Sequence, residues 1–165
     1  MRDSMGDVLA VKTKYLIQAA VIAAVYAALT LLLAPLSYGV LQVRVAEALT
    51  VLPCFTPAAV PGLFIGCVVA NTISPMGIAD LIFGSVASLI AAWLSYLLRS
   101  RPLLVPAPPV VINAVVIGIL LYFVYGIPAP LPVCMAWVAG GQIAACYILG
   151  YPLLCCLKKY KKVFE

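Results

Sequence analysis

The chain has 165 residues, of which 66% are hydrophobic and 9% charged, and its mean hydropathy is +1.20. A water-soluble fold has too little interior to bury that much apolar side-chain surface, so composition excludes an ordinary soluble domain and predicts a protein of the lipid bilayer. The net charge of +5 comes from small basic groups beside apolar stretches rather than from one extended patch, which argues against nucleic-acid binding.

Apolar stretches separated by short segments rich in proline and glycine run along the whole chain. They predict one all-α domain, residues 1–165, in which six transmembrane helices cover about residues 15–33, 40–52, 58–73, 78–98, 110–125 and 133–157. A crossing takes about 20 residues. The second and third segments are shorter than that, so they are expected to be tilted irregularly or partly re-entrant.

Basic residues set the expected orientation of these segments. They fall in three groups, before the first segment, after the fourth and after the sixth: Arg2, Lys12 and Lys14, then Arg99 and Arg101, then Lys158, Lys159, Lys161 and Lys162. With six crossings all three groups lie on the same side, and lysine and arginine mark the cytoplasmic side. Both termini are therefore expected in the cytoplasm.

Three charged residues interrupt the apolar stretches: Arg44, Glu47 and Asp80. A charge at the centre of a bilayer costs about 2.5 to 3.5 kcal/mol on insertion scales, so such residues face a cavity or a partner and often mark a ligand path. Two simpler interpretations stay open. Arg44 and Glu47, three residues apart, neutralise each other, or Asp80 is an acidic residue favoured by a helix N-terminus.

Further candidates for substrate binding are the polar residues Asn71, Asn113 and Gln142 and the aromatic residues Tyr122 and Trp137. The amides also suit ordinary hydrogen bonding between membrane helices. The aromatic rings offer flat stacking surfaces, but rings of this kind also anchor helices at the membrane interface.

The first segment carries two parallel rows of alanine spaced by four residues: Ala19, Ala23 and Ala27, and beside them Ala20, Ala24 and Ala28. Rows of small residues let membrane helices approach closely. They predict either packing inside the bundle or docking onto a separate membrane subunit.

Four segments of the sequence resemble one known family. The run QVRVAEALTVLP at 42–53 is similar to the signature of the queuosine-precursor transporter family of the QueT type, and GLFIGCVVAN at 62–71, ADLIFGS at 79–85 and PPVVIN at 108–113 resemble family segments in the same order. Together these stretches reach over nearly the whole chain.

The resemblance implies a six-helix bundle of the type found in substrate-specificity components of energy-coupling-factor importers, in a bacterial plasma membrane. It further implies capture of a 7-deazaguanine, such as queuine or its aminomethyl precursor, for uptake driven by a transmembrane coupling protein and a pair of ATPases. Under this hypothesis Glu47 accepts the N–H donors of the pyrimidine edge, Arg44 or Asn71 donates to the carbonyl, and Asp80 pairs with the cationic side arm. The alanine rows are similar to the motif by which such components contact the coupling protein.

Alternative functions are a component for a different vitamin, a self-sufficient channel or exchanger, and an intramembrane enzyme. The enzyme is the least favoured, since the sequence has no histidine and no recognisable nucleophile with its base. No metal or cofactor site is expected. The sequence also lacks a G-x-x-x-x-G-K-[ST] loop, so ATP-driven transport needs partner subunits.

Overall fold

The computed structural model describes residues 2–39 and 42–160, and every regular element among them is helical. In chain order the elements are α1 (Arg2–Leu32), α2 (Ala34–Ser37), η1 (Val45–Cys54), α3 (Ala59–Thr72), α4 (Gly77–Ala79), η2 (Asp80–Gly84), α5 (Ser85–Leu97), η3 (Pro102–Leu104), α6 (Ala107–Phe123), α7 (Leu131–Ile143), η4 (Ala144–Leu149) and α8 (Gly150–Lys158). The prediction of an all-α protein is confirmed.

The count of six membrane-crossing helices is not confirmed. Within the described residues, four continuous helical stretches are long and apolar enough to span a bilayer: Leu9–Leu32, Gly77–Leu97, Pro102–Phe123 and Leu131–Lys158. The other two predicted spans correspond to shorter apolar helices, η1 and α3, of 10 and 14 residues. At about 2.0 Å of rise per residue for a 3₁₀ helix, η1 falls well short of the roughly 30 Å of a bilayer core.

Three of the predicted segments begin at clearly different residues in the structure. The first was placed at 15–33, but α1 begins at Arg2. The second segment was placed at 40–52, but η1 begins at Val45, and residues 40–41 lie outside the described part of the chain. The fifth was placed at 110–125, but α6 begins at Ala107. Pro108 and Pro109 lie in its first turn, where a proline has no helical hydrogen bond to lose. In the sequence these two prolines indicated a loop, whereas in the structure they lie in the first turn of a helix.

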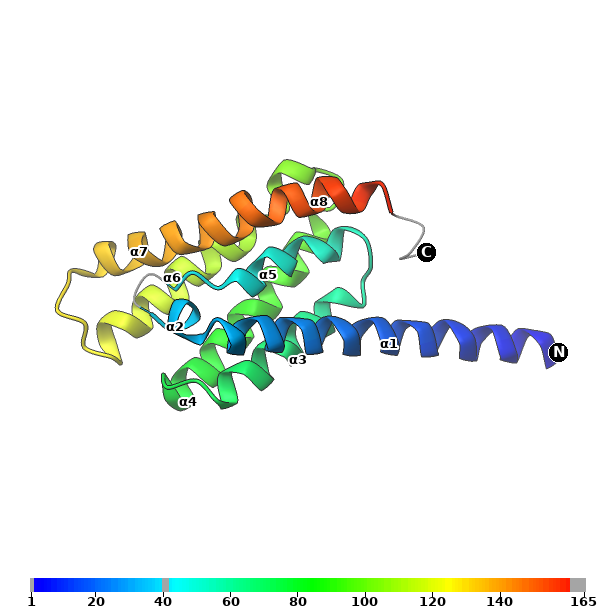
Figure 1. The fold of residues 1–165 in the computed structure, drawn as a ribbon, viewed down its shortest axis with the longest axis horizontal. Coiled ribbons are helices and arrows are strands. Elements are labelled where there is room, and N and C mark those ends of the chain that lie inside the picture. Colours follow the sequence, from blue (N-terminus) through cyan, green and yellow to red (C-terminus); the bar gives the residue numbers. More distant parts are fainter. Residues whose placement is uncertain (1, 40–41, 161–165) are drawn as a thin grey trace.

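The helices run back and forth between two ends of one bundle (Figure 1). α1 and α6 run toward the end that holds α2 and the α6–α7 connection, and the C-terminal rod of α7, η4 and α8 returns. At the opposite end the Cys54 thiol lies 3.5 Å from the carbonyl oxygen of Arg99, and Cys54 is within electrostatic reach of both Arg99 and Lys158. The basic residues after α5 and at the end of α8 therefore share one end of the bundle.

α1 and α3 form the tightest helix contact. A Cβ atom built on Gly62 would lie 2.8 Å from the backbone oxygen of Ala19, and one built on Gly66 would lie 2.8 Å from the backbone oxygen of Ala23. Two small residues four apart on each helix thus let the two backbones touch. This contact holds Tyr26 of α1 against α3, and Tyr26 is completely buried.

Candidate binding site

An ion pair between Arg44 and Asp80 lies inside the bundle. Arg44 Nη2 donates to Asp80 Oδ2 over 3.0 Å, and the two side chains are 4% and 1% exposed. Arg44 immediately precedes η1, while Asp80 begins η2 on the next long helical stretch. The hydroxyl of Ser74 also donates to Asp80 Oδ2, at 3.2 Å. Arg44 therefore pairs with Asp80, and it does not form the direct pair with Glu47 that their spacing permits.

Asn71 joins this pair from the end of α3. Its Nδ2 donates to the backbone oxygen of Asp80 at 3.1 Å and lies 3.4 Å from the Cys67 thiol. The Cys67 thiol in turn lies 3.8 Å from Arg44 Nη1 and 3.2 Å from the hydroxyl of Ser88. Because a carbonyl oxygen only accepts, the bond to Asp80 fixes which end of the Asn71 amide carries nitrogen.

Glu47 reaches the same region from η1. Its Oε1 accepts a hydrogen bond from the Tyr26 hydroxyl at 2.6 Å, and Glu47 is 1% exposed. Thr50, three residues on, donates to the Glu47 carbonyl at 2.6 Å. We refer to the connected set as the Arg44 cluster: Tyr26, Arg44, Glu47, Cys67, Asn71 and Asp80.

The backbone around the cluster is irregular. Gln42 has a φ of 46°, a conformation that residues other than glycine rarely adopt. η1 is an unusually long 3₁₀ helix, and η2 and η4 are π-helical segments, a geometry found often at functional sites. The thiol of Cys146 in η4 lies 3.7 Å from the Glu47 carbonyl oxygen. Three irregular segments thus meet beside the buried charges.

Several buried polar atoms at and beside the cluster have no hydrogen-bond partner within the described residues. Three are acceptors of the cluster itself: Glu47 Oε2, Asn71 Oδ1 and Asp80 Oδ1. The others are Gln42 Nε2, Ser37 Oγ and Tyr125 Oη. Each such atom costs about 1 to 3 kcal/mol if it stays unsatisfied. Most buried polar atoms in folded proteins do have partners, so each of these atoms needs an explanation, and a bound polar guest is one.

The remaining predicted site residues are distributed less tightly. Gln142 is buried, and its Oε1 lies 3.5 Å from the Cys146 thiol, so it adjoins Glu47 through Cys146. Asn113 is buried on α6, and no hydrogen bond joins it to the cluster among the described residues. Trp137 is half-buried on α7. The binding roles of all three stay predictions.

Tyr122 is not placed at the cluster, whereas its neighbour Tyr125 is. Tyr122 is 41% exposed and packs edge to face with Phe123, ring centroids 4.8 Å apart. That position matches the alternative of an interface anchor. The Tyr125 hydroxyl is buried near Asp80, and burial together with the Asp80 charge raises the pKa of Tyr125. Tyr125 therefore stays protonated at neutral pH and available as a donor.

The two alanine rows of α1 differ in burial. Ala19, Ala23 and Ala27 are buried, and the first two meet α3. Ala20, Ala24 and Ala28 are exposed. One row therefore packs within the bundle and the other faces outward.

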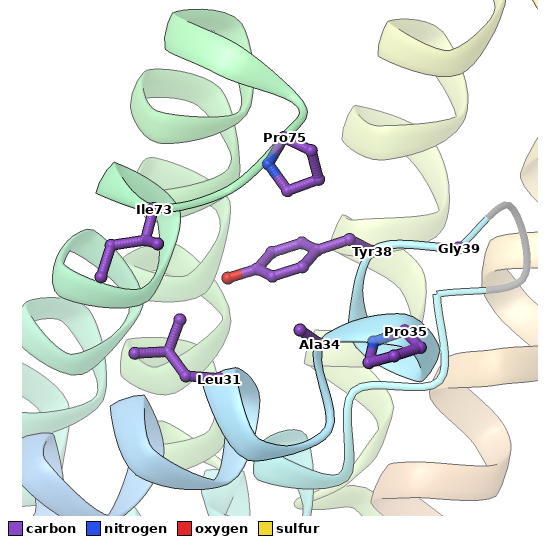
Figure 2. Close-up of a pocket in the computed structure, with 7 residues that line it drawn as sticks. All are labelled: Leu31, Ala34, Pro35, Tyr38, Gly39, Ile73 and Pro75. Carbon is purple, nitrogen blue, oxygen red and sulfur yellow. The ribbon is translucent and has the colours of Figure 1, made fainter.

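An open, mostly apolar cavity of about 580 Å³ adjoins the cluster, and it is lined by Leu31, Ala34, Pro35, Tyr38, Gly39, Ile73 and Pro75. Figure 2 shows the Tyr38 ring extending across this cavity between Pro75 and the end of α1. The Tyr38 hydroxyl donates to the Ala70 carbonyl at 2.7 Å, and the Arg44 guanidinium carbon lies 5.4 Å from the ring centroid. Tyr38 thus contacts both the cavity and the cluster, and burial raises its pKa.

Sequence reasoning did not single out Tyr26, Cys67 or Gln42 as site residues. Tyr26 and Cys67 lie in apolar runs, where a tyrosine or a cysteine is ordinarily a packing residue. Gln42 had a detectable signal, because it is a polar residue two positions before Arg44 in a predicted span.

The architecture defines a class of protein. Exposed apolar helices of membrane-spanning length surround a buried set of charged residues, and charged residues inside a membrane bundle typically mark the path or site of a transported solute. The fold and site are those of a membrane-embedded transport protein.

The chain belongs to the QueT transporter family, whose model matches residues 16–159. The resemblance found in the sequence is therefore confirmed over nearly the whole chain, and it points to transport rather than catalysis. No curated protein matches the chain, and neither does any solved structure.

Proposed function

We propose that this chain is the substrate-specificity component of an energy-coupling-factor importer and that it captures a queuosine precursor, a 7-deazaguanine such as queuine or its aminomethyl precursor. Membership of the QueT transporter family supports transport. The observation that carries the proposal is the Arg44 cluster, in which buried acceptors on Glu47, Asn71 and Asp80 have no partner among the described residues.

The chemistry of a 7-deazaguanine fits these acceptors. Its pyrimidine edge presents an N–H beside an exocyclic amine, and the acceptor atoms Asn71 Oδ1 and Asp80 Oδ1 suit these two donors. Its carbonyl oxygen takes a donor from Arg44 or Gln42. The apolar cavity beside Tyr38 adjoins the cluster. A flat ring stacked on an aromatic side chain, Tyr125 or Trp137, gains about 1 to 3 kcal/mol if it behaves like a stacked base.

We also propose that the chain crosses a bacterial plasma membrane six times with both termini in the cytoplasm. The alternation of helix direction along the bundle supports an even number of passes (Figure 1). Arg99 and Lys158 lie at one shared end, and the basic side of a membrane protein is cytoplasmic. The short helices η1 and α3 cross by extension through their flanking turns and by local thinning of the bilayer. The Arg44 cluster then lies toward the outside.

The partners of this proposal are a transmembrane coupling protein and its two ATPases. The exposed row of Ala20, Ala24 and Ala28 gives a smooth helix face on which another membrane helix packs closely. Ala24→Leu is expected to leave the chain folded and able to bind ligand but to prevent its co-purification with the coupling protein. Ala23→Leu, on the buried row, is expected to destabilise the chain itself. Unchanged co-purification of the Ala24 variant would remove this face from the interface.

A channel or exchanger working alone is the second candidate. It is tested by uptake in vesicles that contain only this protein. Uptake down a gradient without any ATPase favours that candidate, and bound ligand without uptake favours the importer component.

Binding to the purified protein in detergent tests the substrate directly. Titration with the aminomethyl precursor should give saturable binding, and Glu47→Gln and Asp80→Asn should each weaken it by about tenfold or more, as expected for the loss of a charged hydrogen bond. Gly140→Ala is the control, because a Cβ there meets no atom within 4 Å. Unchanged binding in both carboxylate variants would remove Glu47 and Asp80 from the site.

A further inference from the structure

The buried charges of the Arg44 cluster do not balance. The cluster holds one cation, Arg44, and two carboxylates, Glu47 and Asp80, and all three residues are buried. Among residues 9–39 and 42–160, whose side chains the structure describes, one salt bridge is found, and it joins Arg44 to Asp80. Glu47 receives only the neutral hydroxyl of Tyr26 on Oε1, and its Oε2 has no partner in the described structure. Glu47 therefore has no buried cation paired with its carboxyl group.

The unsatisfied atoms point the same way. Of the six buried atoms without partners, Asn71 Oδ1 only accepts hydrogen bonds, and so do Glu47 Oε2 and Asp80 Oδ1 when their carboxyl groups are ionised, whereas Gln42 Nε2 alone only donates. Hydroxyl groups such as that of Tyr125 serve either role. A guest that satisfies this set must bring more donors than acceptors.

From these two observations we infer that the site is built for a ligand that carries one positive charge and several N–H donors, and that Glu47 is the residue that balances the charge. A buried uncompensated carboxylate is strongly unfavourable, and a bound cation removes that cost. A neutral ligand of the same shape supplies no such counter-charge. This inference rests on the proposed function for the identity of the ring, and it assigns the cation to Glu47 rather than to Asp80, whose charge Arg44 already offsets.

Two 7-deazaguanines that differ in charge separate the possibilities. The aminomethyl compound is protonated at neutral pH, and the cyano compound is neutral, while the ring and its donor edge are the same. Calorimetric titration of both into the purified protein is expected to show the aminomethyl compound binding at least about 30-fold more tightly, the scale of one buried charge pair. In Glu47→Gln, which is isosteric, that preference should fall to within a fewfold.

Asn71→Ala is the matched variant that keeps the charge. It is expected to weaken both ligands by a similar factor and to preserve the preference for the cation. Equal affinity of the two ligands in the unmodified protein would overturn the charge inference and leave the proposed substrate class standing. An unchanged preference in Glu47→Gln would overturn the role of Glu47. Failure of both ligands to bind would overturn the proposed function together with the inference. If the Glu47 variant does not fold, the comparison of the two ligands in the unmodified protein still tests the preference for a cation.

Discussion

The α1–α3 contact and the Arg44 cluster are both buried, but they differ in one respect. The contact is closely packed, whereas the cluster has polar atoms without partners in the described structure. At the contact, Gly62 and Gly66 leave no room for a methyl group between the two backbones. At the cluster, acceptors on Glu47, Asn71 and Asp80 lack partners in the described structure. Close packing at the contact indicates a structural role, and the proposed binding role accounts for the unsatisfied atoms of the cluster.

Tyr26 connects the two regions. It is held by the contact, since a Cβ on Gly66 would also lie 2.8 Å from Tyr26 Cβ, and its hydroxyl donates to Glu47. The tightly packed region therefore positions a carboxylate of the incomplete one. Variants that damage one region at a time test this division of roles, because each region predicts a different effect on stability and on binding.

The largest effect is expected from Arg44→Met. It leaves Asp80 as a buried charge without a partner, which costs about 3 to 5 kcal/mol. We expect a fall in the thermal unfolding temperature in detergent of about 10 °C. Adding Asp80→Leu in the same chain removes the stranded charge and should restore most of that loss. An additive loss in the double variant would show that the two residues do not act as a pair.

Gly66→Leu should be the next most damaging change, since overpacking costs about 1 to 3 kcal/mol even where a side chain can move. Here the added atoms meet the Ala23 backbone and Tyr26, so we expect the unfolding temperature to drop by at least about 5 °C. The matched control is Gly140→Leu on α7, where a Cβ meets nothing within 4 Å. Equal stability of the two variants would contradict the close α1–α3 contact.

The smallest effect distinguishes two neighbouring tyrosines. Tyr125→Phe removes a buried hydroxyl that has no partner among the described residues, and we expect ligand affinity to fall about two- to tenfold, the scale of one neutral hydrogen bond. Tyr122→Phe, at an exposed position, should leave affinity unchanged. Titration of both variants with the same ligand measures the two affinities. A larger loss of affinity in Tyr122→Phe than in Tyr125→Phe would contradict the placement of Tyr125 at the site.

Much of the fold follows from hydropathy, because each apolar run does form a helix. Hydropathy does not predict the geometry of η1 and α3. Their short lengths were visible, but the 3₁₀ conformation of Val45–Cys54 depends on contacts with η4 and α3 that no local pattern encodes. The alanine rows make the same point, since the same residue type at the same spacing is buried at Ala23 and exposed at Ala24.

The candidate site was partly accessible from sequence. Charged residues in apolar runs are costly wherever they lie, so Arg44, Glu47 and Asp80 stood out, and the structure places Arg44 and Asp80 together. Spacing along one helix permitted a pair with Glu47, whereas the tertiary fold supplies the partner of Arg44 from a different element. Tyr26 was not identified, because a tyrosine in an apolar run is ordinarily a packing residue.

The most direct test of the central claim is ligand affinity in the double variant Arg44→Met with Asp80→Leu. If the buried ion pair exists to form a binding site, this chain should fold, unfold at a temperature near that of the unmodified protein, and bind the aminomethyl 7-deazaguanine at least about 30-fold more weakly. A folded double variant that binds this compound with full affinity would contradict the account.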